Sequence, residues 1–105
     1  MPATTPSLST IAKPDWTQSL AALPRTAGVY IFKGEGTLPL YIGKSVDIRS
    51  RVLSHVRAAD EAEMIAQTRR VDFVETAGEI GALLLEARLI KQQSPLFNIR
   101  LRRLR

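Results

Sequence analysis

The sequence predicts an α/β protein of the α+β type, with a β-hairpin, two helices, a third strand and a long helix in that order. Two neighbouring segments, Gly28–Lys33 (GVYIFK) and Leu38–Gly43 (LPLYIG), are rich in β-branched and aromatic residues and are separated by the turn sequence GEGT. Such runs on either side of a glycine-rich turn are typical of a hairpin. A third run of this kind is Arg69–Thr76, and Gly78–Gln93 carries apolar residues at helical spacing.

Length and composition indicate one domain without disulfides or thiolate metal sites. The chain has 105 residues, 45% of them hydrophobic, and no cysteine, which suits a reducing compartment. No apolar run approaches the roughly 18 residues of a membrane-spanning helix, and the first ten residues lack the features of a signal peptide. We expect a flexible arm over residues 1–14, the domain over residues 15–99 and a basic tail over residues 100–105.

The excess positive charge is concentrated in this tail. Four of the last six residues are arginines, and without them the net charge of +5 falls to +1. Such a tail contacts nucleic-acid phosphates, or it is only a solubilising end or the broken edge of a longer chain, and the sequence favours neither. The candidate DNA contacts in the tail are Arg100, Arg102 and Arg103.

The shorter helices are predicted from caps and apolar spacing. Asp15 can cap a helix that ends at Pro24. Ser45 is expected to be the N-cap of a helix that runs to about Val56. Ala58–Gln67 should form a second, shorter helix with acidic residues at its start.

The long helix over Gly78–Gln93 is the most apolar segment of the chain, and one carboxylate lies in its middle. Its apolar surface is wide enough that we expect neighbouring elements to wrap most of its circumference. Glu86 lies one turn from Leu83 and Ile90, and a carboxylate flanked by hydrocarbon is costly without a cation or a hydrogen-bond partner. Glu86 therefore either faces solvent or pairs with an arginine, which helix geometry alone favours, or it holds a metal ion.

The predicted elements bring further polar side chains towards one region. Tyr30 and Tyr41 belong to adjacent strands, and the strand register decides the face that each takes. Arg51 and His55 lie one turn apart on the next helix, and Lys44 is expected at the entrance to the same face. A metal site built from histidine and cysteine is excluded, because the chain has one histidine and no cysteine.

This set suits phosphate chemistry. A single carboxylate can hold a hard cation such as Mg²⁺, and a guanidinium can stabilise the charge that develops on a phosphate. A phenol or an imidazole could take a proton from water, and a phenol needs a nearby cation to do so at neutral pH. Taken singly, each residue has a plainer explanation: packed strand tyrosines, an exposed histidine, and Arg49 and Arg51 as a solvated helix face.

The same residues resemble the motifs of the GIY-YIG nuclease family. The sequence GVY begins at Gly28, and YIGK begins at Tyr41 after ten intervening residues. Arg51 follows in the next helix, and the stretches ALLLEARLIK around Glu86 and PLFN ending at Asn98 are similar to the UvrC branch in particular. The order of these motifs, and the residues between them, make the resemblance specific over nearly all of the domain.

The resemblance implies a small three-stranded antiparallel sheet flanked by helices, with an active site made of the matched residues. One of Tyr30 and Tyr41 would activate or position the water, with a slight preference for Tyr41, and Lys44 would assist this proton transfer. Arg51 would contact the scissile phosphate. Glu86 would be the only protein ligand of a single divalent metal ion, Mg²⁺ or Mn²⁺.

Other positions receive structural or open roles from the resemblance. Gly28 and Gly43 would be structural motif residues, and Asn98 would hold the hairpin region through hydrogen bonds. His55 stands where UvrC proteins usually have tyrosine and other branches have histidine, so its role stays open between a base, a phosphate contact and a spacer. Arg49 is a further candidate DNA contact.

The implied function is a metal-dependent DNA endonuclease domain that hydrolyses a phosphodiester bond. In the UvrC branch this is the incision 3′ of a lesion in bacterial nucleotide excision repair, so lesion-bearing double-stranded DNA is the expected substrate and UvrB an expected partner. The expected location is the bacterial cytoplasm, at the nucleoid. Two alternatives stay open: a GIY-YIG nuclease of another DNA-processing pathway, and a non-catalytic DNA-binding module.

Overall fold

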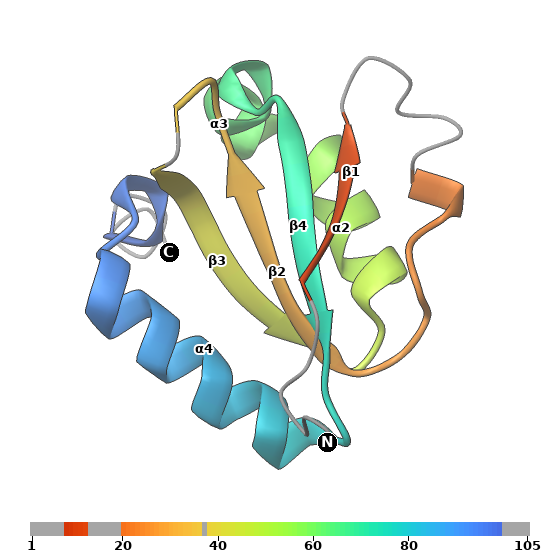
Figure 1. Cartoon of the computed structure of the whole chain (residues 1–105). Helices are drawn as coiled ribbons and strands as arrows, with labels where there is room; N and C mark the ends of the chain where they lie inside the picture. Colours follow the sequence, from red (N-terminus) through yellow and green to blue (C-terminus); the bar gives the residue numbers. More distant parts are fainter. Residues whose placement is uncertain (1–7, 13–19, 37, 100–105) are drawn as a thin grey trace.

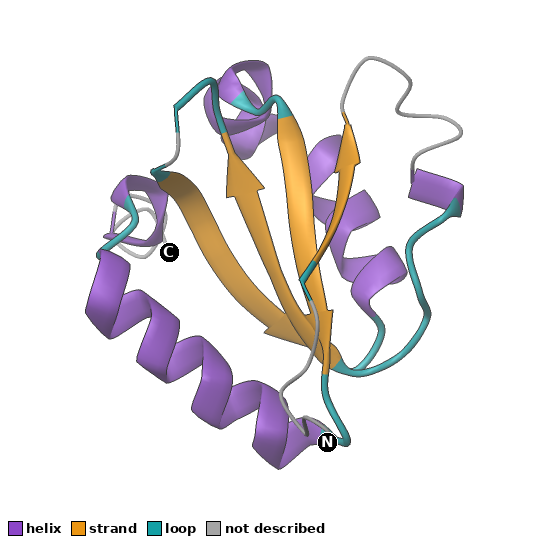
Figure 2. Ribbon diagram, viewed as in Figure 1, coloured by secondary structure: helices purple, strands orange, loops and turns teal. Residues whose placement is uncertain are grey.

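The chain folds into an antiparallel sheet with helices on both of its faces (Figure 1, Figure 2). The computed structural model describes residues 8–12, 20–36 and 38–99. Within these residues, the strands are β1 (Ser9–Ala12), β2 (Gly28–Lys33), β3 (Pro39–Ser45) and β4 (Arg70–Glu75). The helices with both ends described are α2 (Ile48–Arg57), the short 3₁₀ helix η2 (Ala59–Glu61), α3 (Ala62–Gln67) and α4 (Glu79–Gln93), and residues 20–21 and 96–99 are helical as well.

The three predicted strands are confirmed, and β2 lies between the other two. The strand order is β1-β4-β2-β3, and every neighbouring pair is antiparallel. Tyr30 of β2 lies opposite Gly43 of β3 on one side and opposite Phe73 of β4 on the other. The pairing of β2 with β3 shifts by one residue after Phe32, where the hairpin approaches its turn.

The fourth strand corrects the expectation that residues 1–14 form a flexible arm. β1 pairs with β4 along the edge of the sheet, with Ser9 opposite Phe73 and Ala12 opposite Arg70. Backbone hydrogen bonds can hold so short an edge strand without a periodic apolar pattern, which is the signal that sequence reasoning relies on. Residues 1–7 and 13–14, the start of the helix expected at Asp15, and the tail over residues 100–105 lie outside the described part of the chain.

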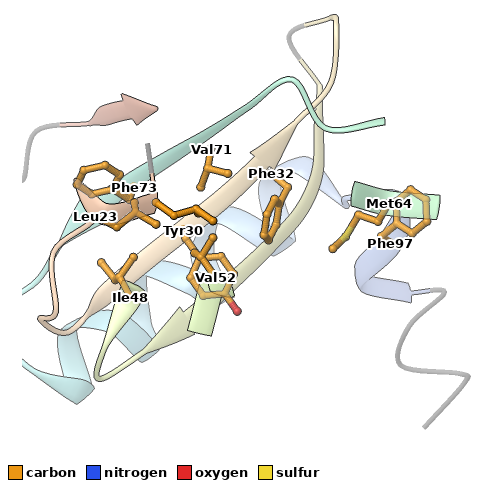
Figure 3. Packing of buried hydrophobic residues seen from close by; sticks show 10 residues of the cluster. Leu23, Tyr30, Phe32, Ile48, Val52, Met64, Val71, Phe73 and Phe97 are labelled. Atoms are coloured by element: carbon orange, nitrogen blue, oxygen red, sulfur yellow. The ribbon is translucent and has the colours of Figure 1, made fainter. Parts of the chain in front are cut away.

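Alternate residues of β2 supply two separate hydrophobic clusters, one on each face of the sheet. On the face covered by α2, Tyr30 and Phe32 pack with Ile48, Val52 and Phe73 (Figure 3). On the opposite face, the buried residues are Val29, Ile31, Ile42 and Ala82, with side chains from α4 packed against them. The sheet therefore lies between α2 and α4. A site with residues from both helices must lie at an edge of the sheet.

Helix α2 begins later than predicted, because Asp47 and not Ser45 is its N-cap. The Asp47 carboxylate accepts a hydrogen bond of 3.1 Å from the Ser50 N–H. Ser45 is still paired with Gly28 in the sheet, so its backbone is extended, and its hydroxyl bonds the backbone of Asp47. The N-cap is therefore a polar residue two positions after the predicted one.

Helix α4 is much less covered than its apolar sequence predicts. Ala82 is its buried residue, whereas Ile80, Leu83 and Leu84 are 74%, 49% and 64% exposed. The helix packs chiefly against β3 and β2, and Figure 1 shows it lying along one face of the sheet with its outer side uncovered. The expectation that neighbours wrap most of α4 is therefore wrong. None of the described helices is long and apolar enough to cross a membrane.

Candidate active site

The site is organised by the pairing of Tyr30 with Gly43. Because these residues lie opposite each other, Tyr30, Tyr41 and Gly43 share one face of the sheet. The Tyr30 ring crosses over Gly43: a Cβ on residue 43 would lie 2.3 Å from the Tyr30 hydroxyl oxygen and 2.4 Å from its Cζ. The two tyrosine rings lie side by side, with their centroids 6.3 Å apart. Only glycine at position 43 leaves room for this arrangement.

His55 completes the aromatic group from α2. Its Nε2 lies 2.7 Å from the Tyr30 hydroxyl oxygen, and its ring centroid is 5.0 Å from that of Tyr41. The residue is only 3% exposed, which contradicts the plain explanation of an exposed helix residue. Figure 3 shows the Tyr30 ring within the buried cluster while its hydroxyl oxygen points out of it.

The structure adds Glu61, which the sequence did not single out. Its carboxylate oxygen Oε1 lies within hydrogen-bond distance of His55 Nδ1, and both residues are 3% exposed. In the sequence, Glu61 is one of several acidic residues at the start of a predicted helix. In the sequence, the one link between the two residues is that Glu61 follows the only histidine by six residues. Because α2 ends at Arg57, helical spacing from His55 does not extend to Glu61.

Burial raises the pKa of Tyr30 well above its usual value, and the charge of Tyr41 adds to the rise. The Arg51 guanidinium opposes this shift in the pKa of Tyr30, both by hydrogen bonding and by its charge, whereas the Glu86 carboxylate reinforces it. Tyr41, Arg51 and Glu86 are therefore all near enough to act on the Tyr30 hydroxyl. A free Tyr30 phenolate is strongly disfavoured at neutral pH in these surroundings.

Arg51 connects this buried group with the surface. It is exposed on α2, and it lines a cavity of about 310 Å³ together with Ser54, His55, Ala58 and Glu61. A guanidinium at the mouth of such a cavity can bind a phosphate with two parallel N–H donors. Arg51 and His55 thus share one side of α2, as their spacing predicted.

Glu86 reaches the site from the opposite face of the sheet. It is half-buried on α4, and α4 covers the face that bears Val29 and Ile42. The Glu86 carboxylate nevertheless influences the pKa of Tyr30. β3 is an edge strand, and its residue opposite Tyr30 is Gly43, which has no side chain to separate the two groups. Among the described residues, no three His, Cys, Asp or Glu side chains gather as a metal site. A lone carboxylate fits a hard cation that keeps most of its waters.

Lys44 is not on the predicted face. It lies opposite Val29, so it points to the α4 side of the sheet, away from the face of Tyr30 and Tyr41. There it lines a cavity of about 220 Å³, of which the other lining residues are Ser45, Val46, Glu79, Ile80, Ala82 and Leu83. The expectation that Lys44 shares the face of Arg51 is wrong, because one residue along a strand reverses the side-chain direction.

The remaining predicted positions are part of the framework. The Asn98 side chain accepts a bond from the Ile42 N–H and donates one to the Ile42 carbonyl, each 2.8 Å long. A Cβ on Gly28 would lie 2.2 Å from the Val74 carbonyl oxygen. Arg49 donates its Nε–H to the Leu23 carbonyl at 2.8 Å, which fixes part of this side chain to the loop before β2.

The predicted DNA contacts of the tail, Arg100, Arg102 and Arg103, lie outside the described residues.

The chain matches the family model of the UvrC-like GIY-YIG domain over residues 26–99. It belongs to this family. The UvrC-like GIY-YIG resemblance inferred from the motifs is therefore confirmed, and the matched range contains the whole candidate site. By family and fold, the chain is a GIY-YIG endonuclease domain.

Relatives of this UvrC-like GIY-YIG domain include two kinds of longer protein. Excinuclease Cho of Shigella flexneri is 71% identical over 82 residues, which cover 77% of this chain and 28% of that protein. UvrABC system protein C of Thermus thermophilus is 45% identical over 86 residues, which cover 81% of this chain and 14% of that protein. The chain therefore spans less than a third of the length of these relatives.

A solved structure of the same UvrC-like GIY-YIG family supports the fold. The N-terminal endonuclease domain of UvrC from Thermotoga maritima, bound to its catalytic divalent cation magnesium, aligns with a TM-score of 0.72 at 29% identity. The alignment covers 81% of this chain and 97% of that domain. The predicted sheet flanked by helices is thus confirmed by an independent fold match, with β1 as an additional strand.

Proposed function

We propose that this domain hydrolyses a phosphodiester bond of lesion-bearing double-stranded DNA with the help of one divalent metal ion, Mg²⁺ or Mn²⁺. The reaction would be the 3′ incision of bacterial nucleotide excision repair. The observation that carries the proposal is the pairing of Tyr30 with Gly43. It gives one hydroxyl group a histidine, an arginine and a carboxylate as neighbours at a single edge of the sheet.

Each side chain has a role that follows from its position. Arg51, exposed beside the buried Tyr30 hydroxyl, would bind the scissile phosphate and stabilise its developing charge. Tyr30 or Tyr41 would take the proton of the attacking water or hold that water in place. Lys44, on the opposite face, would supply positive charge to the DNA and would not take part in the proton transfer.

Glu86 would hold the metal ion, because it is the carboxylate that acts on the Tyr30 hydroxyl and its half-burial limits competing solvent. When bound, the ion would supply Lewis acidity and orient the leaving oxygen. We propose a single ion because Glu86 is the one acidic residue that the described part of the chain brings to this edge from α4.

The substrate and partner are supported by the names of the relatives, excinuclease Cho and UvrABC system protein C. Because the chain spans less than a third of their length, we propose that it works within or beside the remaining parts of such a system. UvrB would then be a partner, the arginine-rich tail would add phosphate contacts, and the bacterial nucleoid would be the location.

The test is a nicking assay on a lesion-bearing plasmid with Mg²⁺ or Mn²⁺, for the wild-type chain and for Glu86→Gln. The variant should fold and bind DNA but fail to cut it, and more metal should restore little activity because the ligand is lost. Glu79→Gln, an exposed position on the same helix, is the matched control and should cut normally. Full nicking by Glu86→Gln at low millimolar metal would overturn the metal-site assignment.

The same plasmid distinguishes the two alternatives. Incision 3′ of the lesion that depends on UvrB supports the repair function, whereas incision of undamaged branched DNA would indicate another GIY-YIG pathway. Binding without incision under all conditions would indicate a non-catalytic module.

A further inference from the structure

Both ring nitrogens of His55 are engaged inside the protein. Nε2 meets the Tyr30 hydroxyl oxygen at 2.7 Å, and Nδ1 meets the Glu61 carboxylate. Because both nitrogens already have protein partners, His55 is not arranged to bind a phosphate directly. This removes one of the three roles that the sequence left open for it.

The chemistry of the two partners assigns the protons. An ionised carboxylate can only accept hydrogen bonds, so the hydrogen between Glu61 and His55 belongs to Nδ1. In the neutral ring Nε2 then carries a lone pair, and the Tyr30 hydroxyl donates its hydrogen to it. This is the order of groups that a proton relay needs: a hydroxyl, an imidazole acceptor, and a carboxylate that fixes the imidazole tautomer and stabilises its protonated form.

The surroundings of His55 favour such a relay. Tyr30 and Phe32 face the ring from β2, Tyr41 faces it from β3, and Glu61 faces it from η2. On its own helix, Arg51 lines the same cavity of about 310 Å³. The Glu61 carboxylate is hydrogen-bonded to the ring. Its carboxylate is buried to the same degree as His55, so water screens the pair little.

We infer that Glu61 is a positioning residue for hydrolysis, which acts through His55 to make the Tyr30 hydroxyl the acceptor of the proton from the attacking water. The inference rests on the proposed function. It assigns the base to Tyr30 and not to Tyr41, towards which the sequence leaned slightly.

The proton transfer balances without a further reactant. The water oxygen forms a bond to phosphorus while one water proton moves to the Tyr30 oxygen. The hydroxyl proton of Tyr30 moves to His55 Nε2, and the resulting imidazolium is stabilised by the Glu61 carboxylate. The P–O bond to the leaving sugar oxygen breaks with its electron pair, and that oxygen takes a proton from solvent. Tyr30 never becomes a free phenolate, which its buried surroundings disfavour.

The first test reads the tautomer of His55 directly and needs neither metal nor DNA. Because the chain contains one histidine, a ¹⁵N-labelled wild-type sample gives a single pair of ring-nitrogen NMR signals. At neutral pH we expect a protonated Nδ1 and a bare Nε2. A neutral ring protonated at Nε2, or a ring protonated at both nitrogens, would overturn the inference, because Nε2 could not then accept the Tyr30 proton.

The second test uses Glu61→Gln, which removes the charge and keeps the size. In the NMR experiment the preference for the Nδ1-protonated tautomer should be lost. Turnover should fall by about 10- to 100-fold, part of the roughly 10²–10⁴-fold that a general base contributes. Asp60→Asn, which removes an exposed carboxylate from the adjacent residue, is the control for charge alone and should change neither measurement.

A double-mutant cycle separates positioning from a general effect on structure. If Glu61 acts through His55, Glu61→Gln should cost nothing more in a His55→Gln background, whereas additive losses would contradict the inference. Unchanged turnover and an unchanged tautomer in Glu61→Gln would also overturn it. If Glu61→Gln does not fold, the NMR measurement of the His55 tautomer in the wild-type chain tests the inference instead. A wild-type chain that never cuts DNA refutes the proposed function, while the tautomer measurement still reports on the Glu61–His55 pair.

Discussion

Tyr30 and Gly43 face each other across β2 and β3, and the tyrosine ring occupies the space where a side chain on residue 43 would lie. Gly43→Ala would place a methyl group 2.3 Å from the Tyr30 hydroxyl oxygen, so the ring must move away from His55. We expect a loss of about 1–3 kcal/mol in the free energy of unfolding, typical of overpacking, together with loss of nicking activity. Urea unfolding and the plasmid assay measure the two effects.

Gly36→Ala is the matched control for this substitution. Gly36 lies in the hairpin turn, and the closest atom to a Cβ there is the Leu38 nitrogen at 4.0 Å. Its stability should stay within about 0.5 kcal/mol of the wild type. Equal effects of the two substitutions would mean that the hairpin backbone, and not the Tyr30 contact, makes position 43 sensitive.

Alkaline pH should destabilise the fold through Tyr30. Burial raises the pKa of Tyr30 in the folded state above the ordinary tyrosine value of 10.0, so above about pH 10 the unfolded chain ionises this tyrosine while the folded chain does not. Unfolding therefore becomes more favourable with rising pH, by up to about 1.4 kcal/mol per pH unit for one group. Denaturant unfolding at a series of pH values should show this slope in the wild type and a smaller one in Tyr30→Phe.

Absorbance of the phenolate provides a direct check. The chain has two tyrosines, so Tyr41→Phe leaves Tyr30 as the only one. In that variant no phenolate should appear near pH 10 until the protein unfolds. Titration of Tyr30 in the folded state near pH 10 would contradict the effect attributed to burial.

Arg51→Lys keeps the positive charge and loses the planar pair of donors. If Arg51 binds the scissile phosphate, we expect turnover to fall by about 10²-fold or more, as when one donor to a transition state is removed. DNA binding should change much less, since the charge remains. Arg57→Lys, at an exposed position in the last turn of the same helix, serves as the control. Turnover close to that of the wild type in Arg51→Lys would reduce Arg51 to a source of general positive charge.

Asn98 should contribute measurably to stability through its two bonds to Ile42. Asn98→Ala leaves a buried N–H and a buried carbonyl of Ile42 without the bonds that the amide supplies, which costs about 1–3 kcal/mol for each group left unsatisfied. Asn98→Asp keeps the acceptor but places a second oxygen against the Ile42 carbonyl, so it should also destabilise. Gln93→Ala, at an exposed site before this segment, should have little effect in the same thermal unfolding measurement.

The elements that the sequence predicted correctly are those whose apolar side chains are buried in the structure. The hairpin, β4 and α2 follow apolar periodicity, and all three are backed by buried clusters. β1 was missed because backbone pairing with β4 defines it. The exposure of α4 was missed because apolar spacing identifies residues that could be buried but does not say whether another element covers them. In the structure the sheet covers one side of the helix, and the apolar residues on the other side stay exposed.

Most residues of the candidate site were predictable from the sequence, whereas their positions relative to one another were less so. Tyr30, Tyr41, Arg51 and Glu86 were identified by motif, and in the structure the last three influence the pKa of the Tyr30 hydroxyl. The face taken by Lys44 depended on the strand register, which motif spacing does not contain. Glu61 belongs to no recognised motif, and its pairing with His55 depends on how the chain turns between α2 and α3.

The two bonds between Asn98 and Ile42 have a consequence beyond stability. β3 is an outer strand of the sheet, and such a strand offers unpaired backbone groups on which a strand of another molecule can assemble. The Asn98 amide presents a donor and an acceptor where the next strand would pair, so it occupies this position without extending the sheet. The Asn98 side chain, on the segment after α4, therefore blocks this part of β3 against pairing with a strand of another molecule.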